Sequence, residues 1–327
     1  MLLGNERFKT KCNILKKRLL ERTIKGEEIR MNQSNVRGHI AAIVTILIWG
    51  TAFITTKTLL RDFEPIEILS YRFTIGFIVL LLIHPHRLKG TSLKQEILFA
   101  MAGLSGLTLY FLLENIALTY TSASNVGVII SAAPFFTAIL SYIFLKTEKL
   151  KPIFFLGFLF AIIGILLISF NGITMLDLNP VGDFLAILAS VLWAVYSILT
   201  RKISEFGYNT IQTTRRIFLY GIIFLIPAMF IFSFDFGIER FSSPSNLASI
   251  LFLGVGASAM CFVTWNFAVK ILGAIKTSIY IYMVPVITVV TSMIILDEIV
   301  TPMSLCGIAL TLIGLVLSER ASKSKKD

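Results

Sequence analysis

The sequence predicts an all-α polytopic membrane protein in which ten transmembrane helices form two inverted five-helix repeats. Three observations predict it: an apolar composition, ten apolar stretches of spanning length, and matched residues in the two halves. Of the 327 residues, 56% are hydrophobic and only 15% are charged, whereas about a quarter of a soluble domain is charged. A chain of this length could not hide so much apolar surface from water, so lipid is the expected solvent.

Ten stretches approach the roughly 20 apolar residues that a helix needs to cross a bilayer. They are His39–Leu60, Ile66–Ile83, Glu96–Leu113, Ser122–Leu145, Pro152–Phe170, Val181–Thr200, Gln212–Phe232, Leu247–Val269, Ala274–Leu296 and Pro302–Ser318. Two of them begin with proline, at a position where the missing N–H costs nothing. The short loops between the stretches favour antiparallel neighbours.

Basic residues predict the orientation of these helices. If the N-terminus is cytoplasmic, only Lys57, Arg61 and Arg240 fall in external segments, and the other loop and tail cations face the cytoplasm. Cytoplasmic loops of membrane proteins carry an excess of Lys and Arg. We therefore expect a multi-pass protein of the cell membrane with both termini cytoplasmic. The net charge of +11 then reflects loops beside anionic lipid and not a nucleic-acid partner.

The chain divides into two tails and two repeats. Residues 1–38 form a charged N-terminal tail, 39–171 the first repeat, 181–318 the second, and 319–327 a basic tail. Residues 1–30 lack the apolar core of a signal peptide. Since Met31 begins a polar lead into the first apolar stretch, we hypothesise that Met31 is the native start.

The two halves match one another residue by residue. Shifts of 144, 151 and 150 residues pair Trp49 with Trp193, Arg72 with Arg216, Asn115 with Asn266, Pro134 with Pro285, Gly157 with Gly307, and Gly164 with Gly314. Each half holds five helices, an odd number, so the two halves cross the membrane in opposite senses. Inverted repeats of this kind are typical of transporters that work by alternating access.

Several motifs resemble a known family. They are the Trp49–Phe53 segment WGTAF, Tyr71-Arg72-Phe73, residues 117–123 and 131–138, and their echoes at 268–274, 283–286 and 296–298. From about residue 39 to 318 the chain resembles the EamA-type ten-helix members of the drug/metabolite transporter superfamily. The resemblance implies a central cavity between two EamA domains, lined by helices one to four and six to nine. It also implies transport of amino acids, other metabolites, nucleotide sugars or drugs. The second half departs from the pattern, with Ala194 after Trp193 and a doubled Arg215-Arg216.

Aromatic and polar residues supply candidates for the cavity wall. The candidates are Trp49, Glu114, Asn115, Trp193, Tyr196, Trp265 and Asn266. Glu114 is the one carboxylate expected at the edge of a spanning segment near the bundle interior. It would receive a substrate ammonium or a coupling proton, or else sit in water at the helix end. The aromatic side chains would line the cavity or anchor the interface, and the amides would bind substrate or tie loops together.

Four residues are candidates for gating or hinge roles. Arg72 and Arg216 lie near opposite faces. They would bind a carboxylate or phosphate, pair with carboxylates of the protein, or extend toward lipid headgroups. Arg215 is expected to be a plain loop charge. Pro134 and Pro285 would kink helices four and nine, either as hinges or as static curvature.

The glycine pairs repeat at seven residues, which places them on one face of a helix. Gly157, Gly164, Gly307 and Gly314 would let helices five and ten approach closely, or would serve dimerisation. No nucleotide-binding or hydrolase motif occurs in the sequence, and no metal or cofactor site is expected.

These observations predict a gradient-driven secondary transporter and not an enzyme. We expect an exporter of small metabolites, such as amino acids or amphipathic compounds, that works by alternating access. A gradient is the expected energy source, since no ATP-binding loop is present, and a proton is the candidate coupling ion. Two alternatives stay open: a flippase or binder of lipid-linked sugars, and a non-transporting membrane scaffold. The expected partners are membrane lipids and a small-molecule substrate, with the chain a monomer or homodimer.

Overall fold

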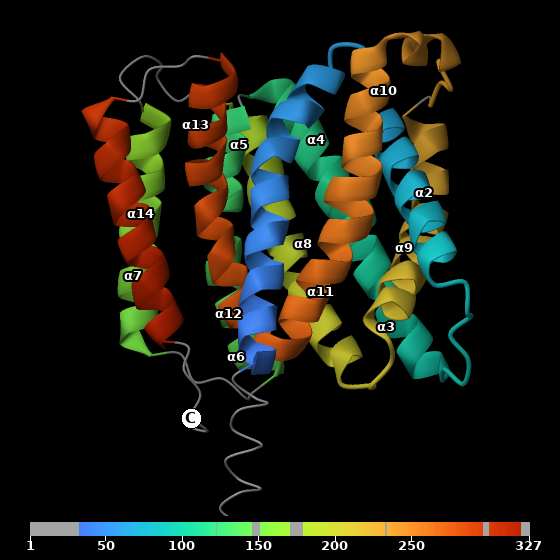
Figure 1. Cartoon of the computed structure of the whole chain (residues 1–327), viewed down its shortest axis with the longest axis horizontal. Coiled ribbons are helices and arrows are strands. Elements are labelled where there is room, and N and C mark those ends of the chain that lie inside the picture. Colours follow the sequence, from blue (N-terminus) through green and yellow to red (C-terminus); the bar gives the residue numbers. More distant parts are fainter. Residues whose placement is uncertain are drawn as a thin grey trace, which may run out of the picture.

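The computed structural model describes residues 33–121, 123–145, 151–170, 179–232, 234–296 and 301–321. Over these residues the chain forms a bundle of roughly parallel upright helices (Figure 1). The first helix begins and the last helix ends at the same end of the bundle, which we call the terminal face. The other end is called the opposite face.

The first half contains five membrane passes. They are the first helix Gln33–Leu59; α2, Pro65–Ile83; the continuous rod of α3 Leu93–Gly103, η1 Leu104–Leu109 and α4 Tyr110–Tyr120; α5 Ala123–Ile130 with α6 Ala133–Phe144; and α7, Pro152–Phe170. Each pass runs antiparallel to the one before it (Figure 1).

The second half repeats this plan. Its passes are α8, Pro180–Ser204; α9, Thr210–Ile231; the rod of α10 Pro244–Leu251, η3 Phe252–Met260 and α11 Cys261–Leu272; α12 Ala274–Ile279, η4 Tyr280–Tyr282 and α13 Met283–Leu296; and α14, Pro302–Ala321. A short helix, η2 Ile238–Ser242, precedes the third pass. The ten passes predicted from the sequence are therefore present among the described residues.

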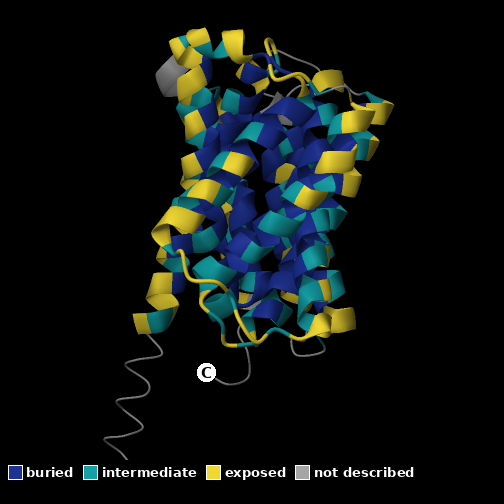
Figure 2. Ribbon diagram, turned by 90° about the vertical axis from the view of Figure 1, so that its right-hand side faces the viewer, coloured by how far each residue is buried: buried dark blue, intermediate teal, exposed yellow. Residues whose placement is uncertain are grey.

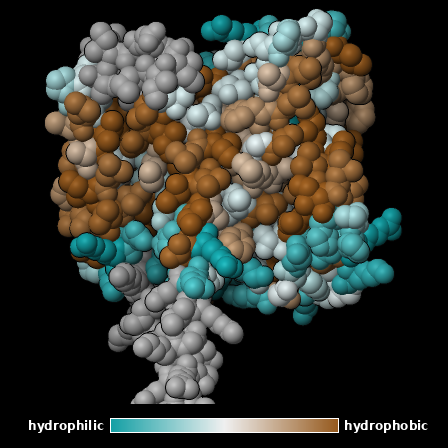
Figure 3. Space-filling view, in the orientation of Figure 1, coloured by the Kyte–Doolittle hydropathy of each residue, from teal (hydrophilic) through white to brown (hydrophobic). Residues whose placement is uncertain are grey.

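Length and composition agree with a membrane setting. Eight passes of the described chain are long and apolar enough to cross a bilayer, and shorter apolar stretches lie in α7 and in the α12–α13 pass. Figure 3 shows a broad apolar band between two hydrophilic ends. Figure 2 shows buried residues along the centre of the bundle and exposed ones at its rim and ends, as expected for a protein that turns apolar side chains toward lipid.

Local signals fix where the helices begin. Asn179 caps α8 by accepting hydrogen bonds from the backbone N–H groups of Val181 and Gly182. Asn209 caps α9 in the same way, through Ile211 and Gln212. These side-chain oxygens satisfy N–H groups that have no partner inside the helix.

The fourth pass of each half is interrupted at matching positions. Ser131 and Ala132 form a turn between α5 and α6, just before Pro134. In the second half the short η4 lies between α12 and α13, just before Pro285. The sequence predicted a kink at each proline, and the regular α-helix is indeed broken just before Pro134 by a turn and just before Pro285 by a 3₁₀ turn. A proline ring clashes with the preceding turn and donates no backbone hydrogen bond.

The third pass of each half carries a matching irregularity. Both contain a π-helical segment, η1 in the first half and η3 in the second. The extra residue of a π-helical turn shifts the side chains that follow it around the helix axis. The residues after η1 and η3, including Glu114 and Trp265, are thereby turned relative to the first part of the rod.

Helices α7 and α14 pack against each other at one edge of the bundle (Figure 1). The four matched glycines lie on this contact. A Cβ atom on Gly164 would be 2.5 Å from the carbonyl oxygen of Gly307, and one on Gly314 would be 2.5 Å from that of Gly157. Only glycine permits an approach this close, so the glycine faces of the two helices are occupied within one chain.

Candidate functional site

The three tryptophans of the chain meet at the centre of the bundle. Trp49 comes from the first helix, Trp193 from α8 and Trp265 from α11. The ring centroid of Trp49 lies 5.1 Å from that of Trp193 and 5.1 Å from that of Trp265. The indole N–H of Trp49 donates to the carbonyl of Ala257 at 2.9 Å, which joins the first half to the second.

A cavity lies between this tryptophan cluster and the opposite face. Most of its wall is apolar or aromatic, as in typical small-molecule sites. Its lining comprises Trp49, Ala52, Phe53, Thr56, Arg72, Tyr110, Phe111, Glu114, Gly127, Ile130, Ser131, Trp193, Ile281 and Val284. Helices from both halves contribute to it, with Trp193 from α8 and Ile281 and Val284 from the pass after α11.

The cavity contains one acid and one base that do not pair with each other. Glu114 is 6% exposed and Arg72 is 2% exposed, yet no ion pair within 4.0 Å joins them among the described residues. The Nε–H group of Arg72 donates to the Ser258 hydroxyl at 3.0 Å. Its guanidinium carbon lies 4.5 Å from the centre of the Phe111 ring, in the range of a cation–π contact.

Glu114 is only partly satisfied. The hydroxyl of Tyr110, one turn earlier on the same helix, lies near its carboxylate, while the Oε2 atom has no partner in the described structure. A buried charge without full compensation costs several kcal/mol. The cavity therefore holds two buried charged groups of opposite sign, each with unused capacity for a ligand.

Hydrogen-bonded polar side chains connect the helices on the terminal side of the tryptophan cluster. The Tyr196 hydroxyl donates to Asn266 Oδ1 at 2.8 Å, and Asn266 Nδ2 donates to the Thr214 hydroxyl at 3.0 Å. The Tyr196 ring also lies 5.0 Å from that of Trp193. Among the candidates for the cavity wall, three do not line the cavity and lie instead on its terminal side: Tyr196, Trp265 and Asn266.

The expected end of the third helix, at Leu113, was wrong. The rod that contains Glu114 and Asn115 continues to Tyr120, and the one that contains Asn266 continues to Leu272. All three residues are therefore inside helices. Asn115 is fully buried, and neither polar atom of its side chain has a partner among the described residues. It does not line the cavity.

The matched arginines lie in different surroundings. Arg72 is buried beside the cavity and does not reach toward headgroups, whereas Arg216 pairs with Glu96 of α3 at 2.7 Å. Tyr220 and Thr91 donate to the same carboxylate at 2.6 Å each. Arg215, expected to be a plain loop charge, is 8% exposed and donates to the carbonyls of His84 and His86.

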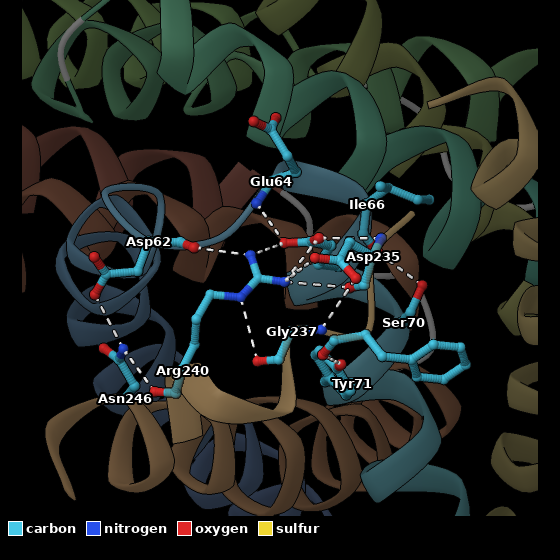
Figure 4. A network of polar contacts seen from close by, with 11 residues as sticks. Asp62, Glu64, Ile66, Ser70, Tyr71, Asp235, Gly237, Arg240 and Asn246 are labelled. Carbon is cyan, nitrogen blue, oxygen red and sulfur yellow. Dashed lines mark hydrogen bonds and ion pairs between the residues drawn. The ribbon is translucent and has the colours of Figure 1, made fainter. Parts of the chain in front are cut away.

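Sequence reasoning missed a second acid–arginine pair, at the opposite face (Figure 4). Glu67 of α2 is 1% exposed, so Glu114 is not the one buried carboxylate. Arg240 donates to Glu67 Oε2 at 2.8 Å and Oε1 at 3.1 Å, and also to the carbonyl of Asp62. The sequence feature that could have indicated this pair is an acid, Glu67, inside the second apolar stretch, together with one of the few external basic residues, Arg240.

Within the described ranges, no group of three His, Cys, Asp or Glu side chains is placed to hold a metal ion. The polar groups of the cavity suit an organic ligand with charged ends.

Comparison with known proteins identifies the family. The family model described as "EamA-like transporter family" matches residues 36–170 and 180–320. A protein of Archaeoglobus fulgidus named an uncharacterized transporter is 28% identical over 289 residues, which cover 87% of this chain and 98% of that protein. A probable terminal-alkyne amino-acid exporter of Streptantibioticus cattleyicolor is 24% identical, with 88% and 94% covered. A solved structure that is 20% identical has a TM-score of 0.67 and covers 88% of this chain and 98% of its own, which supports the fold. Both EamA repeats are matched and the named relatives are transporters, so this chain is a multi-pass membrane transporter and belongs to the EamA-like transporter family.

Proposed function

We propose that this transporter moves small zwitterionic amphipathic molecules, with amino acids as the principal class. The observation that carries the proposal is the pair of buried, mutually unpaired charges in the cavity, Arg72 and Glu114. A substrate carboxylate at the guanidinium and a substrate ammonium at the carboxylate would compensate both charges. Charge-assisted hydrogen bonds of this kind are stronger than neutral ones.

The aromatic wall accounts for the rest of the substrate. Trp49, Tyr110, Phe111 and Trp193 surround the cavity, and such rings favour an apolar or aromatic side chain between the two charges. The amino-acid exporter named among the relatives agrees with this class. It also supports export as the direction of transport.

A proton gradient is the proposed energy source, and Glu114 is the proposed proton acceptor. Its Oε2 atom has no hydrogen-bond partner among the described residues, so a proton and a substrate ammonium can compete for the same carboxylate. The two inverted halves would then rock around the tryptophan cluster and expose the cavity to each side in turn. In this scheme Pro134 and Pro285 act as hinges at the interruptions of the fourth passes.

We further propose that the terminal face is cytoplasmic and that the protein resides in the cell membrane. Among described residues, Arg87, Lys89, Lys94, Arg201, Lys202 and Lys276 lie at or near this face. This excess of basic residues follows the positive-inside rule. A cysteine-accessibility assay on intact cells, with cysteine at Ser92 or at Ser242, would reverse the assignment if Ser92 were labelled first.

Counterflow in liposomes tests the substrate class. Vesicles loaded with an unlabelled apolar amino acid should take up the same labelled compound, and Arg72→Gln and Glu114→Gln should each lower the rate at least tenfold. Arg61→Gln, which removes an exposed arginine at the opposite face, is the control and should keep the rate. If a decarboxylated amine competed as well as the amino acid, the zwitterion assignment would be overturned.

The coupling test uses the same vesicles with an imposed pH gradient. The unmodified protein should accumulate labelled substrate against its gradient. Glu114→Asp should keep some accumulation, because it keeps the carboxyl group. Accumulation that was independent of the pH gradient would contradict proton coupling while leaving the substrate assignment intact.

A further inference from the structure

A second groove lies on the terminal face, away from the cavity. Its lining residues come from α2, from α9 and from the loop that follows α2. These segments are neighbours at one edge of the bundle (Figure 1). Its walls include the apolar side chains of Phe77, Leu81 and Leu219, and its rim carries Arg87, Arg215 and Arg216. The substrate site contains none of these residues.

The groove carries uncompensated positive charge. Arg216 is neutralised by Glu96 at 2.7 Å. In the described structure the guanidinium of Arg215 donates to the loop carbonyls of His84 and His86. These acceptors are neutral, so they do not compensate its positive charge. Arg87 is exposed, and no carboxylate lies within ion-pair distance of it in the described part of the chain. Among the described residues, the positive charges of Arg87 and Arg215 therefore lack a carboxylate counter-ion.

The groove also lies at the boundary between apolar and polar surface. Leu81 is 40% exposed, and the neighbouring Leu82 and Ile83 are 77% and 63% exposed at the end of α2. The loop that follows is polar and basic. Figure 3 shows the same transition from apolar band to hydrophilic end over the terminal side of the bundle. A ligand that fills this groove would meet hydrocarbon-like walls and then guanidinium groups.

We propose that this groove binds an anionic phospholipid of the leaflet that borders the terminal face. One acyl chain would lie along Phe77, Leu81 and Leu219, and the phosphate would lie between Arg87 and Arg215. Guanidinium groups bind phosphate through paired N–H donors, and basic pockets between transmembrane helices favour acidic headgroups. A zwitterionic lipid has no net charge to offset the two free cations, so it should bind more weakly.

Native mass spectrometry of the full chain in detergent tests the proposal. The protein is titrated with phosphatidylglycerol or with phosphatidylcholine of the same acyl chains, and bound lipids are counted. Phosphatidylglycerol should remain bound at lower concentration, and Arg87→Gln should weaken it about fivefold, as expected for one basic residue near the membrane surface. Arg87 is exposed and makes no ion pair with any residue that the structure describes, so this variant should fold normally.

Two further variants separate the groove from general surface charge. Lys89→Gln removes an exposed cation from the same loop outside the groove, and it should leave phosphatidylglycerol binding within twofold. Leu81→Trp fills the apolar part and should weaken both lipids. Equal binding of the two lipids by the unmodified protein, or equal losses in Arg87→Gln and Lys89→Gln, would overturn the proposal.

Discussion

Glu96 on α3 and Arg216 on α9 form an ion pair at the terminal face, with 2.7 Å between carboxylate oxygen and guanidinium nitrogen. At the opposite face Glu67 on α2 pairs with Arg240 at 2.8 Å. In both cases the second pass of one half meets the segment at or near the start of the third pass of the other. The inverted arrangement is therefore retained while the charges are exchanged, and an acid–arginine pair joins the two halves at each end.

The pair at the opposite face should contribute to stability. Replacing Glu67 by Gln leaves Arg240 with weaker partners, and we expect a loss of about 2 kcal/mol, because the carboxylate is buried while the guanidinium is partly exposed. Glu239→Gln, which changes an exposed acid beside Arg240 in the short helix η2, should change stability by less than about 0.5 kcal/mol. Thermal unfolding in detergent measures both, and equal shifts would show that Glu67 has no special role.

The pair at the terminal face should show strong coupling between its partners. Glu96 accepts hydrogen bonds from Arg216, Tyr220 and Thr91, so Glu96→Gln and Arg216→Gln should each destabilise the protein by about 1–2 kcal/mol. The double variant should cost less than the sum of the single variants. Each single variant leaves one charged group without its partner, whereas the double variant leaves none. Additive losses in a double-mutant cycle would indicate that the pair contributes nothing beyond its separate contacts.

The sequence was sufficient for the fold because the membrane leaves few alternatives. Apolar length predicts each pass, and the odd number of passes per half requires inversion. The meeting of Trp49 with Trp193 also follows from the repeat, since matched positions on the first pass of each half approach the same axis. Trp265 joins them from a different pass, and its repeat partner is Glu114, so no symmetry argument predicted that contact.

The remainder depends on packing details that hydropathy does not contain. The π-helical segment η1 turns Glu114 toward the cavity, on a helix that continues well past the expected end at Leu113. Arg240 reaches Glu67 across more than 170 residues of chain. Such pairings require knowledge of which passes are neighbours, and periodicity within one helix does not provide it.

Tryptophan emission should report substrate binding. Trp49 and Trp193 line the cavity, while Trp265 is fully buried behind them, and these are the three tryptophans of the chain. A bound zwitterion should change the emission of the unmodified protein. Trp193→Phe should reduce that change by at least half, whereas Trp265→Phe should largely preserve it. A signal that followed Trp265 instead would place the ligand on the terminal side of the cluster.

Two glycine-to-alanine substitutions should separate stability from transport. Gly164 lies against the backbone of α14, where a Cβ atom would be 2.5 Å from the Gly307 carbonyl oxygen, whereas a Cβ atom on Gly127 would meet nothing within 4 Å. Gly164→Ala should therefore destabilise the protein by about 1–3 kcal/mol through overpacking. Gly127→Ala should maintain or raise stability, because alanine favours a helix by about 1 kcal/mol over glycine. Since Gly127 lines the cavity, its added methyl group should instead lower the transport rate of bulky substrates more than that of small ones. Thermal unfolding and liposome counterflow on both variants test this, and a transport loss in Gly127→Ala that was the same for every substrate size would contradict its placement in the substrate path.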